Sequence, residues 1–284
     1  MNTNTRSTRQ HLVLRKLLRH PSAIIGASII IFFIVLALFA PLIATHDPMQ
    51  TDLANRLKGW SAEYRLGTDG TGRDVFSRVL YGARISLWVG FIAMTFSLGF
   101  GALFGAYAGY YGGWLDNLIM RVMDMLLAMP SILLAMVIVT ILGQSLTNAI
   151  IAVSIVYIPQ YARILRASVL KVRELDYVTA AKVIGASDLR ILFTTVLPNC
   201  LAPLIVQATL GIGAAILDAA GLSFLGLGAE IGIPEWGAML NENTKHIRKA
   251  PLAVTSPGLA IFLVVLGFNL LGDALRDALD PQID

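Results

Sequence analysis

Five long runs of this sequence contain no Asp, Glu, Lys or Arg, and they constrain the fold more than any other feature. The runs are 20–46, 85–115, 125–162, 191–217 and 250–272. Each exceeds the ~20 apolar residues that a helix needs to cross about 30 Å of hydrocarbon. Apolar residues form 56 % of the 284-residue chain and charged residues only 14 %, which excludes a soluble globular domain and a disordered chain. The sequence therefore predicts an all-α polytopic membrane protein.

The third run is too long for a single crossing. It holds 38 residues, and one helix of that length would measure about 57 Å at roughly 1.5 Å per residue. Gly143-Gln144-Ser145 supplies a break, and Pro130 is expected to kink the chain. We therefore predict six transmembrane helices, near 23–44, 85–108, 120–142, 146–162, 200–222 and 254–272. The first run is about twice as long as the apolar region of a signal peptide, so we expect it to be retained as a helix.

Lys and Arg predict the orientation, because cytoplasmic loops of membrane proteins carry an excess of these residues. The arm 1–22 has five basic residues and no acid, and segment 163–199 has six against three, whereas 45–83 and 223–253 are balanced. We therefore expect both termini to be cytoplasmic. The predicted organisation is a basic cytoplasmic arm (1–22), a first span (23–44), an extracytoplasmic loop (45–83), a five-helix core (84–275) with a cytoplasmic loop (163–199) and an extracytoplasmic segment (223–253), and a cytoplasmic tail (276–284).

Small residues recur at every fourth position of the second predicted helix. They are Ala93, Ser97, Gly101, Gly105, Gly109 and Gly113. Residues with this spacing form one ridge on a helix, and such ridges allow helix backbones to approach closely in lipid. We expect Gly101, Gly105 and Gly109 to pack against another helix, either in this chain or in a second subunit.

Asp218 is the one carboxylate deep inside a predicted span. A charge at mid-bilayer costs at least about 2.5–3.5 kcal/mol, so such residues usually face a cavity or a partner. Asp218 is a candidate residue of a translocation path, where it would meet a cationic group. A structural hydrogen bond, or a position near the outer interface, is an equally good interpretation.

The sequence contains no pattern for catalysis, metal binding or nucleotide binding. The four His residues are scattered outside the spans, and HExxH, C-x-x-C and Gly-Lys are all absent, so no zinc-protease motif and no phosphate-binding P-loop exist. We therefore predict no catalytic residue, no metal site and no cofactor on this chain. An ion-coupled secondary transporter would carry ionisable residues in several spans and an internal repeat. Neither is present, so that class is the weaker alternative, and a membrane scaffold is a third.

The stretch 177–190 has the pattern of two short helices joined by a turn. Tyr177, Ala181 and Ile184 fall on one face of the first, Gly185 ends it, and Ser187 or Asp188 is expected to cap the second. Apolar residues of this stretch that face the cytoplasm would need a cover. A protein partner would provide one, and the headgroup layer of the membrane is the alternative.

In this stretch the sequence resembles the permeases of ABC importers. The spacing Ala180-Ala181-xxx-Gly185, followed by Leu197-Pro198, is similar to the EAA loop of that family. Segments 66–78, 234–240 and 268–281 narrow the resemblance to the peptide and nickel branch, and within it to the C-type permease of dipeptide and oligopeptide systems. The resemblance implies the six-helix fold of type I importer permeases in a bacterial inner membrane. It covers the chain from about residue 12 onward.

The resemblance also implies a coupling role for the loop around 177–190, which would dock on an ATPase subunit. The residues of this chain that match the coupling loop of the family are Thr179, Ala180, Ala181, Gly185 and Ala186. Thr179 stands where the family has Glu. The implied partners are a paralogous permease, two cytoplasmic ATPases that bind ATP and Mg, an extracytoplasmic binding protein, membrane lipid and a peptide substrate, but no nucleic acid. A nickel chelate or haem is the alternative cargo within this branch.

Overall fold

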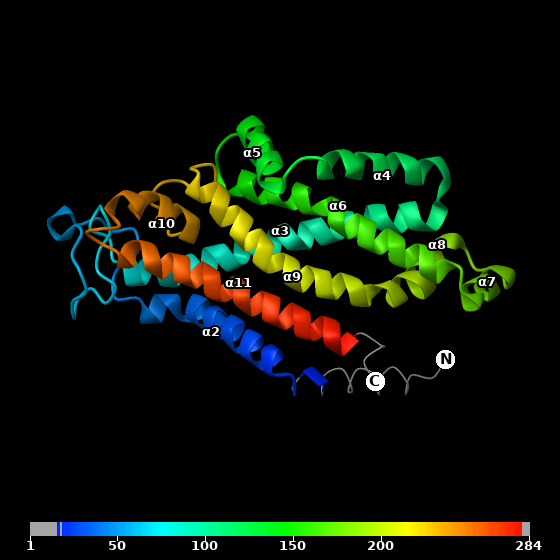
Figure 1. Ribbon diagram of the computed structural model, residues 1–284, viewed down its shortest axis with the longest axis horizontal. Helices are drawn as coiled ribbons and strands as arrows, with labels where there is room; N and C mark the ends of the chain where they lie inside the picture. Colours follow the sequence, from blue (N-terminus) through cyan, green and yellow to red (C-terminus); the bar gives the residue numbers. More distant parts are fainter. Residues whose placement is uncertain (1–15, 18, 280–284) are drawn as a thin grey trace.

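The chain folds almost entirely into helices, most of which run along the long axis of the molecule (Figure 1). The computed structural model describes residues 16, 17 and 19–279. Most of the predicted arm 1–22 and part of the tail 276–284 lie outside the described residues. The helices are α2 (Pro21–Ile43), α3 (Val75–Tyr111), α4 (Gly113–Leu127), α5 (Ser131–Leu142), α6 (Leu146–Arg173), α7 (Asp176–Val183), α8 (Asp188–Ile191), α9 (Leu197–Phe224), α10 (Trp236–Asn243) and α11 (Leu252–Leu279). No strand occurs among the described residues, where the only β pairing is an isolated bridge between Thr68 and Asp74.

Five helical stretches are long and apolar enough to cross a membrane. They are α2, α3, α6, the continuous stretch Asp188–Phe224 that ends in α9, and α11. A π-helical turn, Leu192–Val196, joins α8 to α9 within that stretch. The side chains of α2 that face away from the bundle are large and apolar, as expected for a surface in contact with lipid.

The single helix predicted over 120–142 is wrong. Instead, α4 and α5 meet at an angle of 95°, so this region is a broken span or a re-entrant segment (Figure 1). Pro130 explains the break, because proline lacks an N–H group and also disfavours the helical conformation of the residue before it. The predicted break after α5 is present: α5 ends at Leu142, and the Ser145 side chain caps α6 by accepting a hydrogen bond from the Asn148 amide.

Three helices extend beyond the predicted spans. Helix α3 begins at Val75 rather than near 85, α6 continues to Arg173 rather than 162, and α11 reaches Leu279. Charge-free runs mark the part of a helix that lies in hydrocarbon, whereas the helix itself continues as long as its backbone hydrogen bonds do. The ends of segments 45–83 and 163–199 are therefore helical.

The glycines at every fourth position of α3 lie against α6 of the same chain. A methyl group added at Gly101 would lie 2.5 Å from the Tyr161 Cβ, and one at Gly105 would collide with the carbonyl oxygen of Ala162. Gly109 faces α6 one turn further along. We call Gly101, Gly105 and Gly109 the glycine ridge. It brings the two helices together backbone to backbone, which only residues without a side chain allow.

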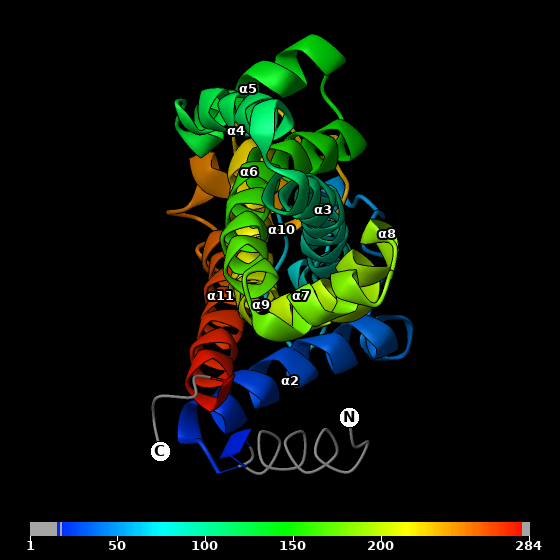
Figure 2. The same cartoon turned by 90° about the vertical axis from the view of Figure 1, so that its right-hand side faces the viewer.

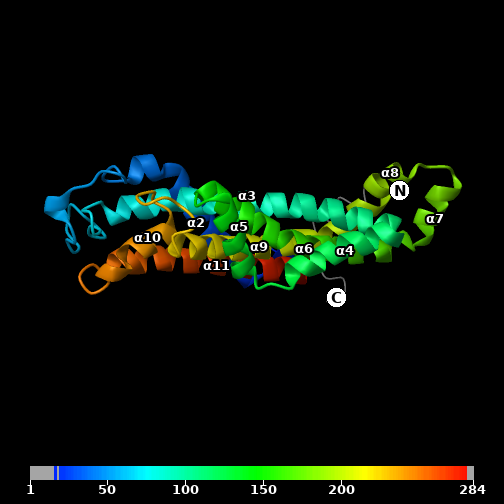
Figure 3. The ribbon, with the colours of Figure 1, turned by 90° about the horizontal axis from the view of Figure 1, so that it is seen from above.

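The two ends of the bundle carry different structures (Figures 1 and 3). Helices α7 and α8 project at one end, and α10 lies with the loop 44–74 at the other. Helices α4 and α5 lie along the outside of α6 (Figure 2), where α4 packs on both α3 and α6. The functional candidates from the sequence divide between the α7 end and the middle of the bundle.

Candidate functional site

Helix α7 ends in a tight turn that Gly185 makes possible. Gly185 has a φ of +84°, a left-handed conformation that side chains disfavour. Its amide donates to the Lys182 carbonyl at 3.0 Å, and the Ala186 amide donates to the Ala181 carbonyl at 3.1 Å. These two bonds form a Schellman motif, which satisfies carbonyls at the end of the helix. The turn therefore fixes the direction in which the chain enters α8.

The bundle covers one large apolar residue of α7 and leaves the others exposed. Val178 is completely buried against the bundle, whereas Tyr177 and Ile184 are exposed. Val183 and Ile184 are 81 % and 83 % exposed, so they form the apolar tip of this end. Helix α7 is pinned by the bundle, and this contact rather than its own periodicity determines which face is covered.

The predicted coupling residues lie together around this tip. Thr179, Ala180 and Gly185 are exposed, whereas Ala181 and Ala186 are partly buried and pack on the core. The three exposed positions have small side chains.

The expected cap of the second short helix is absent. Ser187 occupies the N-cap position of α8 but makes no side-chain capping bond. The Asp188 carboxylate instead accepts a hydrogen bond at 2.8 Å from the hydroxyl of Tyr110, near the end of α3. Its partner is therefore a distant residue, which the local sequence does not reveal.

Tyr110 connects α3 to several parts of the α7 end. Its hydroxyl binds Asp188, and the Lys182 ammonium lies 5.7 Å from the centre of its ring. Arg173, at the end of α6, donates to the carbonyl oxygens of Gly109 and Tyr110 at 2.8 and 3.3 Å. We call Tyr110, Arg173, Lys182 and Asp188 the Tyr110 anchor. It ties the α7–α8 segment to the ends of both α3 and α6.

Asp218 lies in α9 and is partly exposed. Its Oδ2 accepts a hydrogen bond at 2.9 Å from the hydroxyl of Tyr157 on α6. In the part of the chain that the structure describes, no Lys, Arg or His lies within ion-pair distance of this carboxylate. The hydrogen bond from Tyr157 fits the interpretation of Asp218 as a structural residue. The lack of a nearby cation among the described residues also fits its interpretation as a residue of the translocation path, which would meet a cationic group.

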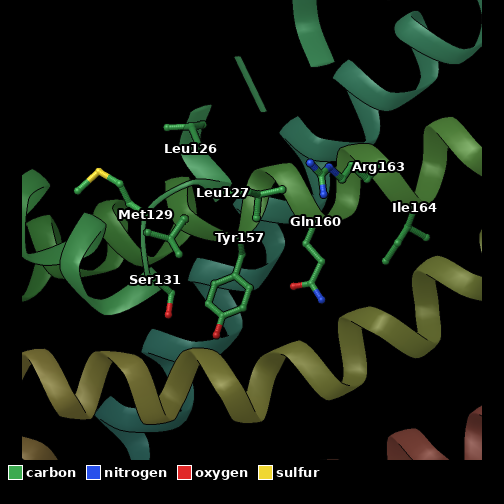
Figure 4. Close-up of a pocket in the computed structure, with 9 residues that line it drawn as sticks. Leu126, Leu127, Met129, Ser131, Tyr157, Gln160, Arg163 and Ile164 are labelled. Carbon is green, nitrogen blue, oxygen red and sulfur yellow. The ribbon is translucent and has the colours of Figure 1, made fainter. Parts of the chain in front are cut away.

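Tyr157 also lines a cavity of about 510 Å³ between α6 and the break that separates α4 from α5. Ser131, Gln160 and Arg163 contribute the other polar groups of its wall, and Figure 4 shows the Ser131 and Tyr157 hydroxyls on the same side, toward α9. The volume lies in the range of small-molecule binding sites. Sequence reasoning missed this cavity, because it depends on the broken third span.

At the opposite end, four charged side chains form a buried ion cluster. Arg73 contacts Asp69 at 2.8 Å and Glu242 at 2.5 Å, and Arg78 contacts Glu242 at 3.1 Å. Glu242 also accepts a hydrogen bond from the Gly232 amide at 2.6 Å. Arg78 is completely buried. The ion cluster therefore joins the loop before α3, the start of α3, and the segment that contains α10.

Two acids at this end have shifted pKa values with opposite signs. Burial works to raise the pKa of Asp69, but Arg73 and hydrogen bonds from the neighbouring loop outweigh it, so the pKa is lowered. Burial dominates at Glu235 and raises its pKa, although the carboxylate accepts hydrogen bonds from the Gly237 and Ala238 amides at the start of α10. Among the described residues, no three His, Cys, Asp or Glu gather as they would around a metal ion.

Comparison with known proteins identifies the class to which this arrangement of helices belongs. The profile of the binding-protein-dependent transport system inner membrane component matches residues 101–284, and that of the N-terminal transmembrane domain of oligopeptide transport permease C matches residues 8–59. The chain belongs to this family of inner-membrane permeases. It is a multi-pass permease subunit of an ABC importer rather than an enzyme, and ATP is hydrolysed by partner ATPases.

The relatives extend over nearly the whole chain. The dipeptide transport system permease protein DppC of Alkalihalophilus pseudofirmus is 54 % identical over 95 % of this chain and 88 % of its own length. DppC of Escherichia coli is 49 % identical over 93 % of this chain and 90 % of its own. The glutathione transport system permease protein GsiD of Escherichia coli is 47 % identical over 96 % and 90 %.

A solved structure supports the fold. An inward-facing structure of the MetNI methionine ABC transporter matches with a TM-score of 0.58 and 18 % identity, over 72 % of this chain and 97 % of that one. At this identity the match concerns the fold alone. It agrees with the importer-permease architecture that the sequence predicts.

Proposed function

We propose that this permease subunit imports dipeptides or short oligopeptides. The observation that carries the proposal is the identity of about one half with dipeptide permeases over more than nine tenths of the chain. The glutathione permease relative also has a small peptide in its name. A nickel chelate or haem is the alternative cargo within the same branch.

In the proposed arrangement the α7 end is cytoplasmic and the α10 end is extracytoplasmic. The six-span topology, with α4 and α5 as one broken span, then leaves both termini in the cytoplasm. The excess of Lys and Arg in 1–22 and 163–199 supports this orientation. Segments 45–83 and 223–253, which the ion cluster holds together, would receive the substrate-binding protein.

A paralogous permease would complete the pathway, and two ATPase subunits would dock on the two permeases. In this chain the docking surface consists of Thr179, Ala180, Ala181, Gly185 and Ala186, together with the apolar tip. The exposure of Val183 and Ile184 supports this role, because large apolar side chains that face water favour a partner. Binding of ATP would move this surface, and the Tyr110 anchor would pass the movement to α3 and α6.

The substrate is tested with the complete complex in proteoliposomes. The permease pair, the ATPases and the binding protein are reconstituted together, and ATP-dependent uptake of a labelled dipeptide is measured. We expect uptake that stops when the ATPases cannot hydrolyse ATP. Uptake of a nickel chelate or haem with no peptide uptake would contradict the peptide assignment, and uptake that persists without ATP would contradict the mechanism.

The docking surface is tested by crosslinking. Ala181→Cys is expected to crosslink to the ATPase in the transporting complex, whereas Ala54→Cys, an equally small change in an exposed loop at the other end, is expected to give no crosslink. Native Cys200 is fully buried and supplies a low background. A transporting complex in which Ala181→Cys never crosslinks would refute docking at this position.

A further inference from the structure

Polar groups from three helices converge beside the cavity between α6 and the break that separates α4 from α5. Ser131 begins α5, Tyr157 lies on α6, and Asp218 lies on α9. The hydroxyls of Ser131 and Tyr157 point the same way, toward α9 (Figure 4). Gly221, one turn beyond Asp218, faces Ile132 at the start of α5. The break at Pro130 therefore brings the start of a helix close to the only acid in α9.

The Asp218 carboxylate has fewer hydrogen-bond and ion-pair partners than an ionised group inside a membrane protein usually has. It receives one side-chain hydrogen bond, from Tyr157, and no cation within ion-pair distance among the described residues. Ionisable groups inside membrane proteins usually face a partner or a water-filled path. A carboxylate accepts several hydrogen bonds, so Asp218 retains capacity for another donor. Its partial exposure makes this capacity accessible.

We propose that Asp218 and Tyr157 bind the ammonium group at the amino terminus of a peptide as it passes through the membrane. This inference rests on the proposed peptide import. An ammonium group has three N–H donors. One would bind the carboxylate, and another would bind the Tyr157 oxygen, which keeps its lone pairs while its hydrogen is donated to Asp218.

The rest of the cavity suits the remainder of a short peptide. Gln160 lies one turn beyond Tyr157 on α6, and Arg163 two turns beyond, which places them about 4.5 and 9 Å further along the helix axis. Two or three extended residues span roughly 7–10 Å. The Gln160 amide both donates and accepts, so it matches the peptide backbone. Arg163 is held by Asp124 at 2.5 Å, so the ammonium end is the better defined contact.

Recognition of the amino terminus fits the task of a permease. Every unmodified peptide has this group, whatever its side chains, so one carboxylate serves many substrates. The site is partly exposed, and its carboxylate is already shared with the Tyr157 hydroxyl, so it binds weakly. Weak binding lets the peptide leave toward the cytoplasm.

The proposed contact is tested by crosslinking the amino group of the peptide to the Asp218 carboxylate. A water-soluble carbodiimide activates carboxylates, and an amine in contact with an activated carboxylate forms an amide bond with it. The reconstituted transporting complex is treated with carbodiimide in the presence of ATP, binding protein and a dipeptide, and adducts are located by mass spectrometry. We expect an adduct of the dipeptide on Asp218, none with the N-acetylated dipeptide, and at least a several-fold lower yield in Tyr157→Phe.

A transport measurement accompanies the crosslink. Asp218→Asn keeps the shape of the side chain and removes its charge, and Asp277→Asn makes the same change at the end of α11, where the side chain is half exposed. Loss of one charge-assisted hydrogen bond corresponds to about a tenfold effect. We expect Asp218→Asn to reduce dipeptide uptake about tenfold and to raise the ATP used per peptide by the same factor. We expect Asp218→Glu to restore part of the activity and Asp277→Asn to behave as the unmodified complex.

The inference and the proposed function fail in different ways. If the unmodified complex imports no peptide, the proposed function is wrong. If it imports peptide but no dipeptide adduct forms on Asp218, while methylamine in place of the peptide does form one, the inference is overturned. A carboxylate that neither amine reaches overturns it equally, as does an Asp218→Asn complex with unchanged uptake and unchanged ATP use.

Discussion

The role of the ion cluster at the α10 end is tested by the substitution Glu242→Gln. Glu242 is the acid that Arg73 and Arg78 share, and Asp69 is the other acid of the cluster. The two positive and two negative charges balance. Glutamine keeps the size of the side chain and an oxygen that can still accept from the Gly232 amide. The substitution therefore removes charge with little change in packing.

The expected cost follows from what remains after the substitution. Arg73 keeps its contact with Asp69 at 2.8 Å, but the Nε of Arg78 lies 3.7 Å from the Asp69 carboxylate and has no hydrogen-bond partner. Arg78 is thus left as a fully buried cation whose remaining counter-charge, Asp69, lies 3.7 Å away and is shared with Arg73. Breaking a buried pair in this way costs about 3–5 kcal/mol. For a chain of this size, each kcal/mol corresponds to roughly 2–4 °C in Tm.

The assay is thermal unfolding of the purified permease pair in detergent, with limited proteolysis of the loop 44–74 as a local readout. We expect Glu242→Gln to lower Tm by at least about 6 °C and to expose the loop to protease. Glu230→Gln, the same change at an exposed position of the same segment, should alter neither. If the two variants are equally stable, the cluster does not hold this end together, and the reasoning is refuted.

Acid should weaken the same cluster. The Arg73 guanidinium and the hydrogen bonds from the loop outweigh burial and hold the pKa of Asp69 below its ordinary value in the folded protein. A group whose folded pKa is lowered contributes stability above its unfolded pKa and loses it as pH falls through the folded value. We therefore expect part of the stability to disappear below about pH 4, and Asp69→Asn to remove that part of the pH dependence. An unchanged acid profile in Asp69→Asn would contradict this.

Three further predictions concern the glycine ridge and the α7 end. Gly105→Ala places a methyl group against the Ala162 carbonyl and should lower stability by about 1–3 kcal/mol, whereas Gly99→Ala, which has open space around it, should be neutral in the same unfolding assay. Tyr110→Phe removes the hydroxyl of the Tyr110 anchor and should speed hydrogen exchange of the α8 amides about tenfold, and unchanged exchange would argue against the anchor. Val183→Asp puts a charge on the apolar tip and should weaken ATPase binding at least about tenfold in a pull-down assay, and full binding would remove this residue from the docking surface.

The sequence predicted those features of the helices that depend on the type of single residues. Each charged side chain is excluded from hydrocarbon whatever its neighbours are. The charge-free runs therefore located each of the five long apolar helical stretches in the described part of the chain. The breaks at Gly143 and Gly185 were predicted for a similar reason, because both residues adopt a positive φ and end a helix locally. The break at Pro130 was expected as a kink, but its angle depends on the helices against which α4 and α5 pack.

The contacts between distant parts of the chain were not predictable in this way. Tyr110 and Asp188 are 78 positions apart, and Arg78 and Glu242 are 164 positions apart. Each residue has an ordinary local context, so the sequence alone does not show which acid meets which base. The burial of Val178 on α7 was not predicted, for a related reason. A helix of eight residues has too few turns for its periodicity to decide between two apolar faces, and Val178 is buried because the bundle lies beside it.

The backbone contact along the glycine ridge has a mechanical consequence. At these glycines the backbone of α3 lies directly against α6, so neither helix can rotate or slide without collision, and we expect α3 and α6 to move as one body. Helix α3 has 37 residues, about 55 Å of helix, with Arg78 of the ion cluster near its beginning and Tyr110 near its end. We therefore expect a displacement at one end of α3 to be transmitted to its other end. We expect the two faces of the membrane to communicate through the tilt of this pair, with its internal geometry unchanged throughout the transport cycle.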